Sequence, residues 1–316
     1  LVHVDSISLG EVTDVNCLLL TDKNLLLLGT DRGIVPVDIH SGNMEMAHSE
    51  MVYPHVSHPV TAMTAFDRHL LISTETRGIL DFDWETGEFY MDEKRQFLNN
   101  PLLHATTSYL DSHHNIWLGT FNQGFYMDAK TRSTPDYYFN DIIQGKFVTR
   151  ICPDTDDNIW IGTRYDGLYH YNIHTHITQH YTTDNFPVFK AVGSNFVESM
   201  MYDSRQNLWM GIGKHLVKMP VSADGHIGPV TTFNVNTEIV AIAESKDGNI
   251  WTGSSSDGIC LITPTGELRR LSIPHRKWMN VTYILPLRSG QMLYSVYGEG
   301  LYVAYPQTLA ITSLTA

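Results

Sequence analysis

Seven copies of one short motif predict an all-β fold, a single seven-bladed β-propeller built from four-stranded antiparallel blades. The best copy, DTDDNIWIGTRYDGLYHYN, covers residues 154–172, and the good copies read D-x-x-x-N-[IL]-W-x-G-[TS]-x-x-x-G-[ILF]. A copy returns every 42 to 49 residues, with the positions equivalent to the Trp at Leu27, Leu71, Trp117, Trp160, Trp209, Trp251 and Leu293. Periods of this length with several strands per repeat are typical of propeller blades, whereas a helical solenoid needs a 3.6-residue periodicity that the chain lacks.

Each copy is expected to supply four strands, as the repeat around Trp160 illustrates. Its strands are predicted at residues 147–152, 159–163, 167–171 and 178–181. The first two are joined by the tight turn PDTDDN, whose Asp and Asn side chains can hydrogen-bond to the backbone. Apolar residues occupy both faces of these strands, as expected when each blade is packed between two neighbours.

Two glycine positions recur in the motif. The first ends the second strand and predicts a close approach of neighbouring chain; it is Gly29, Gly119, Gly162, Gly211 and Gly253, with Ser73 and Ser295 in the other copies. The second precedes the third strand and is expected to take a positive φ; it is Gly33, Gly78, Gly124, Gly167, Gly258 and Gly300. The fifth copy has Leu216 at this second position, which predicts an altered loop there and a candidate recognition feature.

Terminal strands are expected to close the ring. The tail AITSL, residues 310–314, supplies an outer strand of the last blade, and residues 2–8 pair with the last or the first blade. Closure removes the exposed strand edges that are a hazard in repetitive β proteins. Residues 1–316 are therefore predicted to form one propeller with no linker and no second domain.

Composition excludes several classes of protein. A formal net charge of −13 and the lack of basic runs argue against a nucleic-acid partner. The longest apolar runs fall far short of the roughly 20 residues of a membrane helix, so no direct membrane contact is expected. Residue 1 is Leu and nothing near it resembles a signal peptide, which suggests a mature protein or an excised fragment. Cys17, Cys152 and Cys260 lie in different repeats among hydrophobic neighbours and are expected to be buried free thiols.

Three strings carry a resemblance to a known family: NIWLGTFNQGFY, NIWIGTRYDGLYHYN and SNFVESMMYDSRQNLWMGIG. They resemble the two-component regulator propeller repeat, whose usual form is close to S-N-x-V-x-x-I-x-x-D-x-x-G-x-[IL]-W-[IF]-G-T-x-x-G-[IL]-x-x-[YF]. The copies around Leu27, Leu71 and Leu293 depart from this form because they lack the Trp. The pattern also differs from the G-H and W-D signature of WD40 blades.

The resemblance implies a sensor. In that family such repeats form the extracytoplasmic part of bacterial hybrid two-component systems, and members from gut Bacteroidetes usually detect glycan fragments. By this likeness the chain is one periplasmic propeller that detects an oligosaccharide or another small polar ligand and signals to a kinase outside it. The implied partners are a neighbouring propeller and a homodimer of the full-length sensor. The chain itself is not expected to be an enzyme.

The candidate ligand-binding face carries the loops between the second and third strands, together with the loops that lead from the fourth strand to the next blade. Sugar binding needs flat apolar rings and planar polar groups, which these loops contain. The candidate residues are Arg77, Phe121, Asn122, Arg164, Tyr165, Asp166, Lys214, His215, Trp278 and Tyr297. The alternative for any one of them is a solvated loop residue, or for Trp278 a ring packed between blades. The longest insertion, TTDNFPVFKAVGSN at residues 182–195, lies in the second loop set.

Metal binding and catalysis have weaker support. His170, His174, His176 and His180 lie close together in HYNIHTHITQHY, and two His two apart on a strand could bind zinc; a polar outer edge that prevents edge pairing is the preferred interpretation. No metal, cofactor or catalytic residue is therefore predicted. Two alternatives stay open: a propeller enzyme, such as a virginiamycin B lyase-like or glycan-acting lyase using His104 or His215, and a protein-interaction scaffold.

Overall fold

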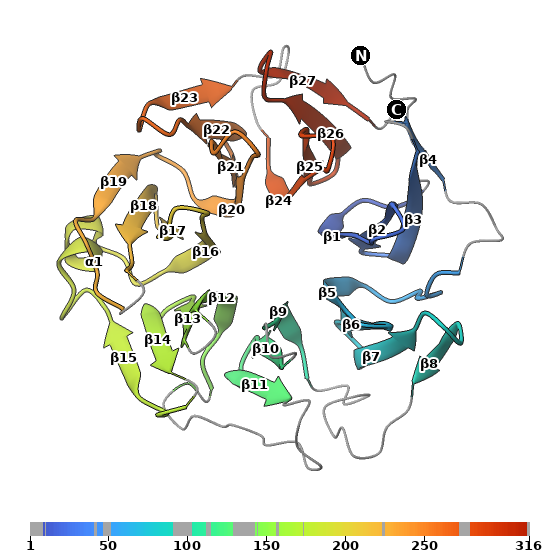
Figure 1. Cartoon of the computed structure of the whole chain (residues 1–316), viewed down its shortest axis with the longest axis horizontal. Coiled ribbons are helices and arrows are strands. Elements are labelled where there is room, and N and C mark those ends of the chain that lie inside the picture. Colours follow the sequence, from blue (N-terminus) through green and yellow to red (C-terminus); the bar gives the residue numbers. More distant parts are fainter. Residues whose placement is uncertain are drawn as a thin grey trace.

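The computed structural model describes residues 9, 11–40, 43–46, 52–90, 103–111, 115–128, 143, 145–155, 158–172, 174–222, 225–271 and 279–314. Seven antiparallel sheets stand in a ring, each built from consecutive strands, and the first strand of every sheet faces the axis (Figure 1). The predicted seven-bladed all-β propeller is confirmed. In the described part of the chain no helix is long and apolar enough to cross a membrane.

The strands follow the chain in simple order around the ring. Blades 1 to 4 comprise β1 (Val15–Leu20), β2 (Leu25–Thr30), β3 (Gly33–His40) and β4 (Asn43–Met46); β5 (Val60–Phe66), β6 (His69–Thr74), β7 (Gly78–Asp83) and β8 (Glu88–Tyr90); β9 (Ala105–Leu110), β10 (Ile116–Thr120) and β11 (Phe125–Asp128); and β12 (Val148–Thr155), β13 (Asn158–Thr163), β14 (Leu168–Asn172) and β15 (Thr178–Tyr181). The fourth strand expected in blade 3 falls on residues outside the described part.

Blades 5 to 7 complete the ring. They comprise β16 (Val197–Tyr202), β17 (Asn207–Ile212), β18 (His215–Pro220) and β19 (Thr231–Asn234); β20 (Ile239–Glu244), β21 (Ile250–Ser254), β22 (Ile259–Ile262) and β23 (Leu268–Leu271); and β24 (Val281–Pro286), β25 (Met292–Val296), β26 (Gly300–Tyr305) and β27 (Ala310–Ser313). One short helix, α1 (Pro187–Val192), interrupts the described strands; it lies in the long insertion between blades 4 and 5 and buries Phe189. The helix was not predicted.

The indole of the motif Trp explains the conserved spacing within the chain. In blade 5 the Nε1 of Trp209 donates to a carboxylate oxygen of Asp203 at 2.7 Å, and the Asn207 side chain donates to the same carboxylate at 2.8 Å. Equivalent bonds join Trp117 to Asp111, Trp160 to Asp154 and Trp251 to the hydroxyl of Ser245. Where Leu replaces Trp, the position six residues earlier is Thr21, Ala65 or Leu287. The carboxylate is thus missing where the indole donor is missing, because an unpaired buried carboxylate is costly.

The first motif glycine is required by contact between blades. A Cβ added to Gly253 of blade 6 would lie 2.3 Å from Cγ1 of Val281, the first residue of β24 in blade 7. Gly29, Gly119, Gly162 and Gly211 meet Val60, Val148, Val197 and Ile239 in the same way, all within 2.9 Å. Ser73 takes the glycine position in blade 2, and the first residue of the following blade is there the small Ala105. The second motif glycines all have positive φ, as predicted.

A girdle of hydrogen bonds ties the first strands together near one end of the axis. In each case a side chain of one blade donates to the carbonyl of the first strand residue of the next: Asn16 to Val60, Thr61 to Ala105, Thr106 to Val148, Thr149 to Val197, Ser199 to Ile239 and Thr282 to Val15, at 2.5 to 3.0 Å. The last of these closes the ring between blades 7 and 1. Between blades 6 and 7 a parallel bridge of Asp257 with Met279 is found instead.

The termini agree with the prediction where they are described. The AITSL tail forms β27 at the outer edge of blade 7, as expected. The predicted pairing of residues 2–8 falls outside the described residues. All three cysteines are buried and free, and burial raises the pKa of the Cys17 and Cys152 thiols to about 12.

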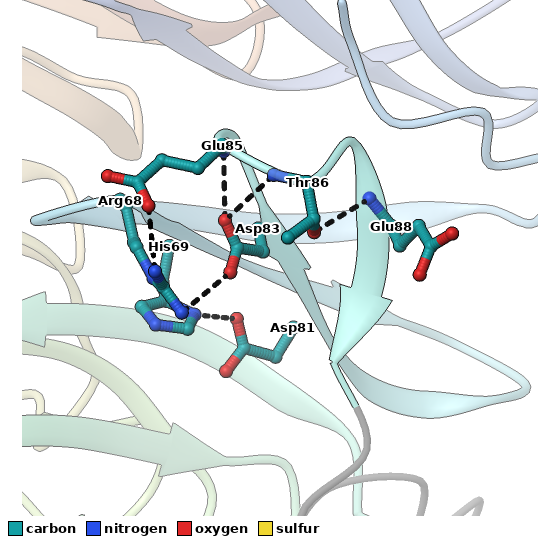
Figure 2. A network of polar contacts seen from close by, with 7 residues as sticks. All are labelled: Arg68, His69, Asp81, Asp83, Glu85, Thr86 and Glu88. Carbon is teal, nitrogen blue, oxygen red and sulfur yellow. Dashed lines mark hydrogen bonds and ion pairs between the residues drawn. The ribbon is translucent and has the colours of Figure 1, made fainter.

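A polar network braces blade 2 on the end opposite the candidate face (Figure 2). Arg68, in the turn between β5 and β6, pairs with Asp83 at 3.1 Å and with Glu85 at 2.7 Å, while His69 bonds to Asp81 at 2.9 Å. Burial raises the pKa of Asp83, but hydrogen bonds from backbone N–H groups and the charge of Arg68 outweigh it and lower the pKa. The network links two turns of one blade and is structural.

Candidate functional site

Both predicted loop sets lie on one face, held there by a repeated backbone hydrogen bond. In every blade the residue that precedes the first strand accepts a bond from the loop between the second and third strands: Asp14 from Asp31, Pro59 from Glu75, His104 from Phe121, Phe147 from Arg164, Phe196 from Gly213, Glu238 from Ser255 and Asn280 from Tyr297, at 2.8 to 3.2 Å. The two loop types therefore stand side by side around the mouth of the axis. We call this end of the ring the loop face.

The Thr of the motif fixes the shape of these loops. Its hydroxyl donates to the carbonyl of the second motif glycine, as from Thr163 to Gly167 at 2.8 Å, and accepts from a loop N–H, as from Asp166 at 3.0 Å. The same pair of bonds recurs at Thr30, Thr74, Thr120 and Ser254. Blade 5 has Ile212 instead and turns over only Gly213 and Lys214, which is the altered loop that Leu216 predicted. Side chains between the clamped ends are held outward on a fixed backbone.

Blades 3 to 5 bring five of the loop-face side chains together. The guanidinium carbon of Arg164 lies 5.2 Å from the ring centre of Phe147, 5.8 Å from that of Tyr165 and 5.4 Å from that of Phe196. Phe121 packs against Phe147 with ring centres 4.5 Å apart. These distances fall within the range of cation–π and aromatic pairs. We call these five residues the aromatic–arginine platform.

The platform is open to solvent at its edges. Tyr165 is 75% exposed and Phe121 is 50% exposed, and both rank among the large hydrophobic side chains that remain outside the core. Phe147, Arg164 and Phe196 are half-buried and hold the exposed rings in place. Arg164 makes no ion pair within the described residues, and its guanidinium lies beside three aromatic rings. Exposed aromatic surface of this kind is characteristic of a binding site.

Asp166 is already paired with two side chains outside its loop, one in the connection before β12 and one on β14. It forms an ion pair with Lys146 at 2.8 Å and accepts a hydrogen bond from the hydroxyl of Tyr169. Burial raises the pKa of Asp166, but the hydrogen bonds from Lys146 and Tyr169 outweigh it and lower the pKa. The carboxylate positions the Tyr165 loop.

Glu198 adds a buried carboxyl beside the platform. Burial raises its pKa, and this effect outweighs the charges of Arg150 and Arg164, which act in the opposite direction. Neither arginine forms an ion pair with it, and the exposed Glu238 raises the pKa further. The centre of the loop face therefore carries two guanidinium groups that no ion pair with a described residue neutralises.

The other predicted residues within the described part of the chain lie in the loops of the loop face and make no cation–π or ring contact with the platform. Arg77, Asn122 and Lys214 are exposed, and Tyr297 of blade 7 is 58% exposed. His215 begins β18 and has a buried Nδ1 without a hydrogen-bond partner. Trp278 lies outside the described residues. Phe147 and Phe196 were missed because the repeat pattern leaves their position variable, as the x of S-N-x-V; the signal is the aromatic residue directly before the Val that begins the first strand.

The histidine cluster is structural, and its interpretation as a polar outer edge is wrong for His170. That ring is buried, stacks on Trp160 with centres 3.9 Å apart, and bonds to Asp154 at 2.9 Å. His180 stacks on Tyr169 at 4.1 Å. In the described part of the chain no group of three or more His, Cys, Asp or Glu side chains is placed to hold a metal. No contact brings His104 and His215, the candidates for catalysis, together.

Fold and site together define the class: a seven-bladed β-propeller with an exposed aromatic surface at one end of its axis. Residues 142–165 match the family model described as two component regulator propeller. The chain therefore carries a repeat of this family, and the resemblance predicted from the motifs is confirmed. The matched segment contains Phe147, Arg164 and Tyr165.

Known proteins resemble this chain in sequence or in fold. The chain is 25% identical over 184 residues to histidine kinase P4 of Formosa agariphila, and this aligned region covers 55% of the chain and 13% of the kinase. It superposes with a TM-score of 0.73 and 22% identity on the extracellular domain of a B. thetaiotaomicron protein described as hybrid two component system BT4673, covering 95% of this chain and 39% of that domain. Virginiamycin B lyase from Staphylococcus aureus superposes with a TM-score of 0.70 and 12% identity, over 94% and 97% of the two chains.

The sensor relatives are longer than this chain. The chain spans a small fraction of the length of the curated kinase and about two fifths of the length of the solved extracellular domain. The structural likenesses, all at low identity, concern the fold.

Proposed function

We propose that this propeller is the ligand-sensing part of an extracytoplasmic two-component sensor and binds an oligosaccharide on the aromatic–arginine platform. The observation that carries the proposal is the exposure of Tyr165 and Phe121 around Arg164 on a clamped loop backbone. The match of residues 142–165 to the regulator propeller family supports the class of protein.

The chemistry of the platform suits a sugar. The axial C–H groups of a pyranose stack on an aromatic face, and a guanidinium supplies planar donors for ring oxygens and hydroxyls. Phe147 and Phe196 hold Arg164 between them, so little side-chain entropy remains to be lost on binding. A rigid surface of this kind recognises a repeating polar ligand with a small loss of ordering entropy.

The same proposal includes a larger sensor protein of which this propeller is one part, and the relatives support it. Histidine kinase P4 and the extracellular domain of BT4673 are both longer than this chain, which fits one propeller in a larger periplasmic sensor. Signalling then requires a kinase, and a neighbouring propeller or a second copy of the sensor is the expected partner. No catalytic step is assigned to this chain.

A binding assay with matched variants tests the proposal. Purified propeller is titrated with a panel of neutral and acidic oligosaccharides by calorimetry and by thermal shift. Tyr165→Ala should weaken binding of any active sugar roughly tenfold or more, since one aromatic contact of this kind contributes about 1 to 2 kcal/mol. Because Tyr165 is largely exposed, its removal should leave the melting temperature without ligand nearly unchanged.

Ile177→Ala is the control. Ile177 is 61% exposed in the same blade, in the turn at the opposite end of β14, and its removal should leave sugar affinity intact. The proposal fails if no oligosaccharide binds, or if Tyr165→Ala and Ile177→Ala reduce affinity equally. Turnover of a sugar or a lactone by the isolated chain would favour the lyase alternative.

A further inference from the structure

An axial cavity of 210 Å³ lies where the first strands of the blades meet. Every blade contributes to its lining, which includes Asn16, Thr61, Thr107, Arg150, Ser199 and Tyr283. The volume corresponds to roughly seven water molecules at about 30 Å³ each, enough for a small organic or inorganic ion. Most of the polar lining groups are hydroxyls and amides.

Arg150 supplies the one charge among the lining residues. Arg150 lies on β12 of blade 4, and its side chain extends past blade 5 to blade 6. There its Nη2 donates to the carbonyl of Val240 at 3.3 Å. Nη1 donates to the carbonyl of Thr149 at 2.8 Å. A guanidinium has five N–H donors, so three remain for another partner. Within the described residues Arg150 makes no ion pair.

Two hydroxyl groups of the lining also have no hydrogen-bond partner among the described residues. Tyr283 projects from β24 of blade 7, and burial raises the pKa of its hydroxyl, which therefore stays protonated as a donor. Thr107 projects from β9 of blade 3, with its Cγ2 methyl packed at Gly119. Blades 3, 4 and 7 thus each contribute to the lining a residue that carries a donor group.

No carboxylate lines the cavity to balance this charge. Glu198 lowers the electrostatic cost of Arg150 from outside the lining, but it forms no ion pair with it, and burial raises the pKa of Glu198. Arg150 is half-buried, and a guanidinium partly removed from water is stabilised when an anion or a set of acceptors pairs with it. The two carbonyls supply only part of that pairing.

We propose that the axial cavity binds a small oxyanion, a carboxylate or a phosphate, through Arg150 with Tyr283 and Thr107 as further donors. Guanidinium groups bind planar oxyanions with two parallel hydrogen bonds, and neutral hydroxyl donors complete such sites. The site is distinct from the aromatic–arginine platform and does not depend on sugar binding there. An occupant would connect blades 3, 4, 6 and 7 and so stabilise the folded ring.

Thermal unfolding in the presence of anions tests the site. Sodium phosphate, sulfate, acetate and glucuronate are titrated against wild-type protein, with sodium chloride at matched ionic strength and neutral glucose as references. At least one oxyanion should raise the melting temperature in a saturable way while chloride and glucose do not. A preference for phosphate or sulfate identifies an inorganic ion, and a preference for glucuronate over acetate identifies a sugar acid.

Variants assign the effect to the cavity. Arg150→Gln should weaken the active oxyanion tenfold to hundredfold, and Tyr283→Phe or Thr107→Val about tenfold each, as expected for charge-assisted hydrogen bonds. Arg269→Gln removes an exposed arginine of the outer strand β23, away from the cavity and the loop face, and should change nothing. Equal stabilisation of wild type and Arg150→Gln overturns the proposal, as does the lack of any oxyanion effect. If Arg150→Gln does not fold, unchanged affinity in both hydroxyl variants overturns it.

Discussion

Gly253→Ala should destabilise the ring by forcing blades 6 and 7 apart. The added Cβ would lie 2.3 Å from Cγ1 and 2.7 Å from Cβ of Val281, far inside van der Waals contact. Overpacking of this kind costs about 1 to 3 kcal/mol, against a gain of about 0.4 to 1 kcal/mol from the reduced entropy of the unfolded chain. The net expectation is a loss of about 1 to 2 kcal/mol in the free energy of unfolding.

A second substitution should relieve part of the clash. Val281→Ala alone removes buried methyl groups at about 2 kcal/mol, the transfer free energy plus a small cavity. In the double variant the 2.3 Å contact with Cγ1 is gone but the 2.7 Å contact with the Cβ of residue 281 remains, so its stability should lie between that of Val281→Ala alone and the sum of the two single losses. The chain already contains this solution, because Ser73 in place of glycine precedes a blade that begins with Ala105.

Urea unfolding followed by tryptophan fluorescence measures the four proteins of the cycle. Gly228→Ala is the control, since its added Cβ meets nothing closer than 3.3 Å. A Gly253→Ala protein as stable as wild type would refute the packing argument. So would a double variant whose loss equals the sum of the single losses to within about 0.5 kcal/mol.

Two further predictions concern the motif and the loop face. Asp203→Ala should lower the free energy of unfolding by about 2 to 4 kcal/mol, because it leaves the buried indole N–H of Trp209 without an acceptor. In a Trp209→Phe background, which lacks that N–H, the loss measured by urea unfolding should be smaller by about 1 to 2 kcal/mol. Asp166→Asn should lower stability at pH 7 by at most about 1 kcal/mol, since the pair with Lys146 is partly exposed. The pKa of Asp166 is lower in the folded state than its unfolded value near 3.8, so the carboxylate stabilises the fold above pH 3.8 and this stabilisation is lost as the pH falls through the folded pKa. The melting temperatures of wild type and Asp166→Asn should therefore converge at acid pH. A difference that stays constant with pH would contradict this.

Much of the fold could be predicted because its determinants are local. The spacing of Asp154, Trp160 and Gly167 gives a hairpin in any copy, and repetition of that hairpin every 42 to 49 residues leaves a ring as the arrangement without open edges. Helix α1 was missed because one turn of helix in a long insertion has no periodicity of its own.

The site could be predicted only as a face. Strand polarity places both loop sets at one end of the ring, which the sequence order alone implies. It does not say which loops meet. Phe147 and Phe196 occupy the same variable position of the repeat, directly before the first strand, and they meet Arg164 because blades 4 and 5 are neighbours in the ring.

The sequence by itself determined the repeat, the number of blades and the roles of Trp160, Gly162 and Gly167, because a hairpin and its close contacts are decided within one or two repeats. The tertiary structure decided that Asp166 is occupied by Lys146, that Arg164 lies among aromatic rings, and that Arg150 spans from blade 4 to blade 6. These contacts depend on the curvature of the closed ring, which brings residues 90 positions apart, as Arg150 and Val240, and 267 positions apart, as Thr282 and Val15, to one axis.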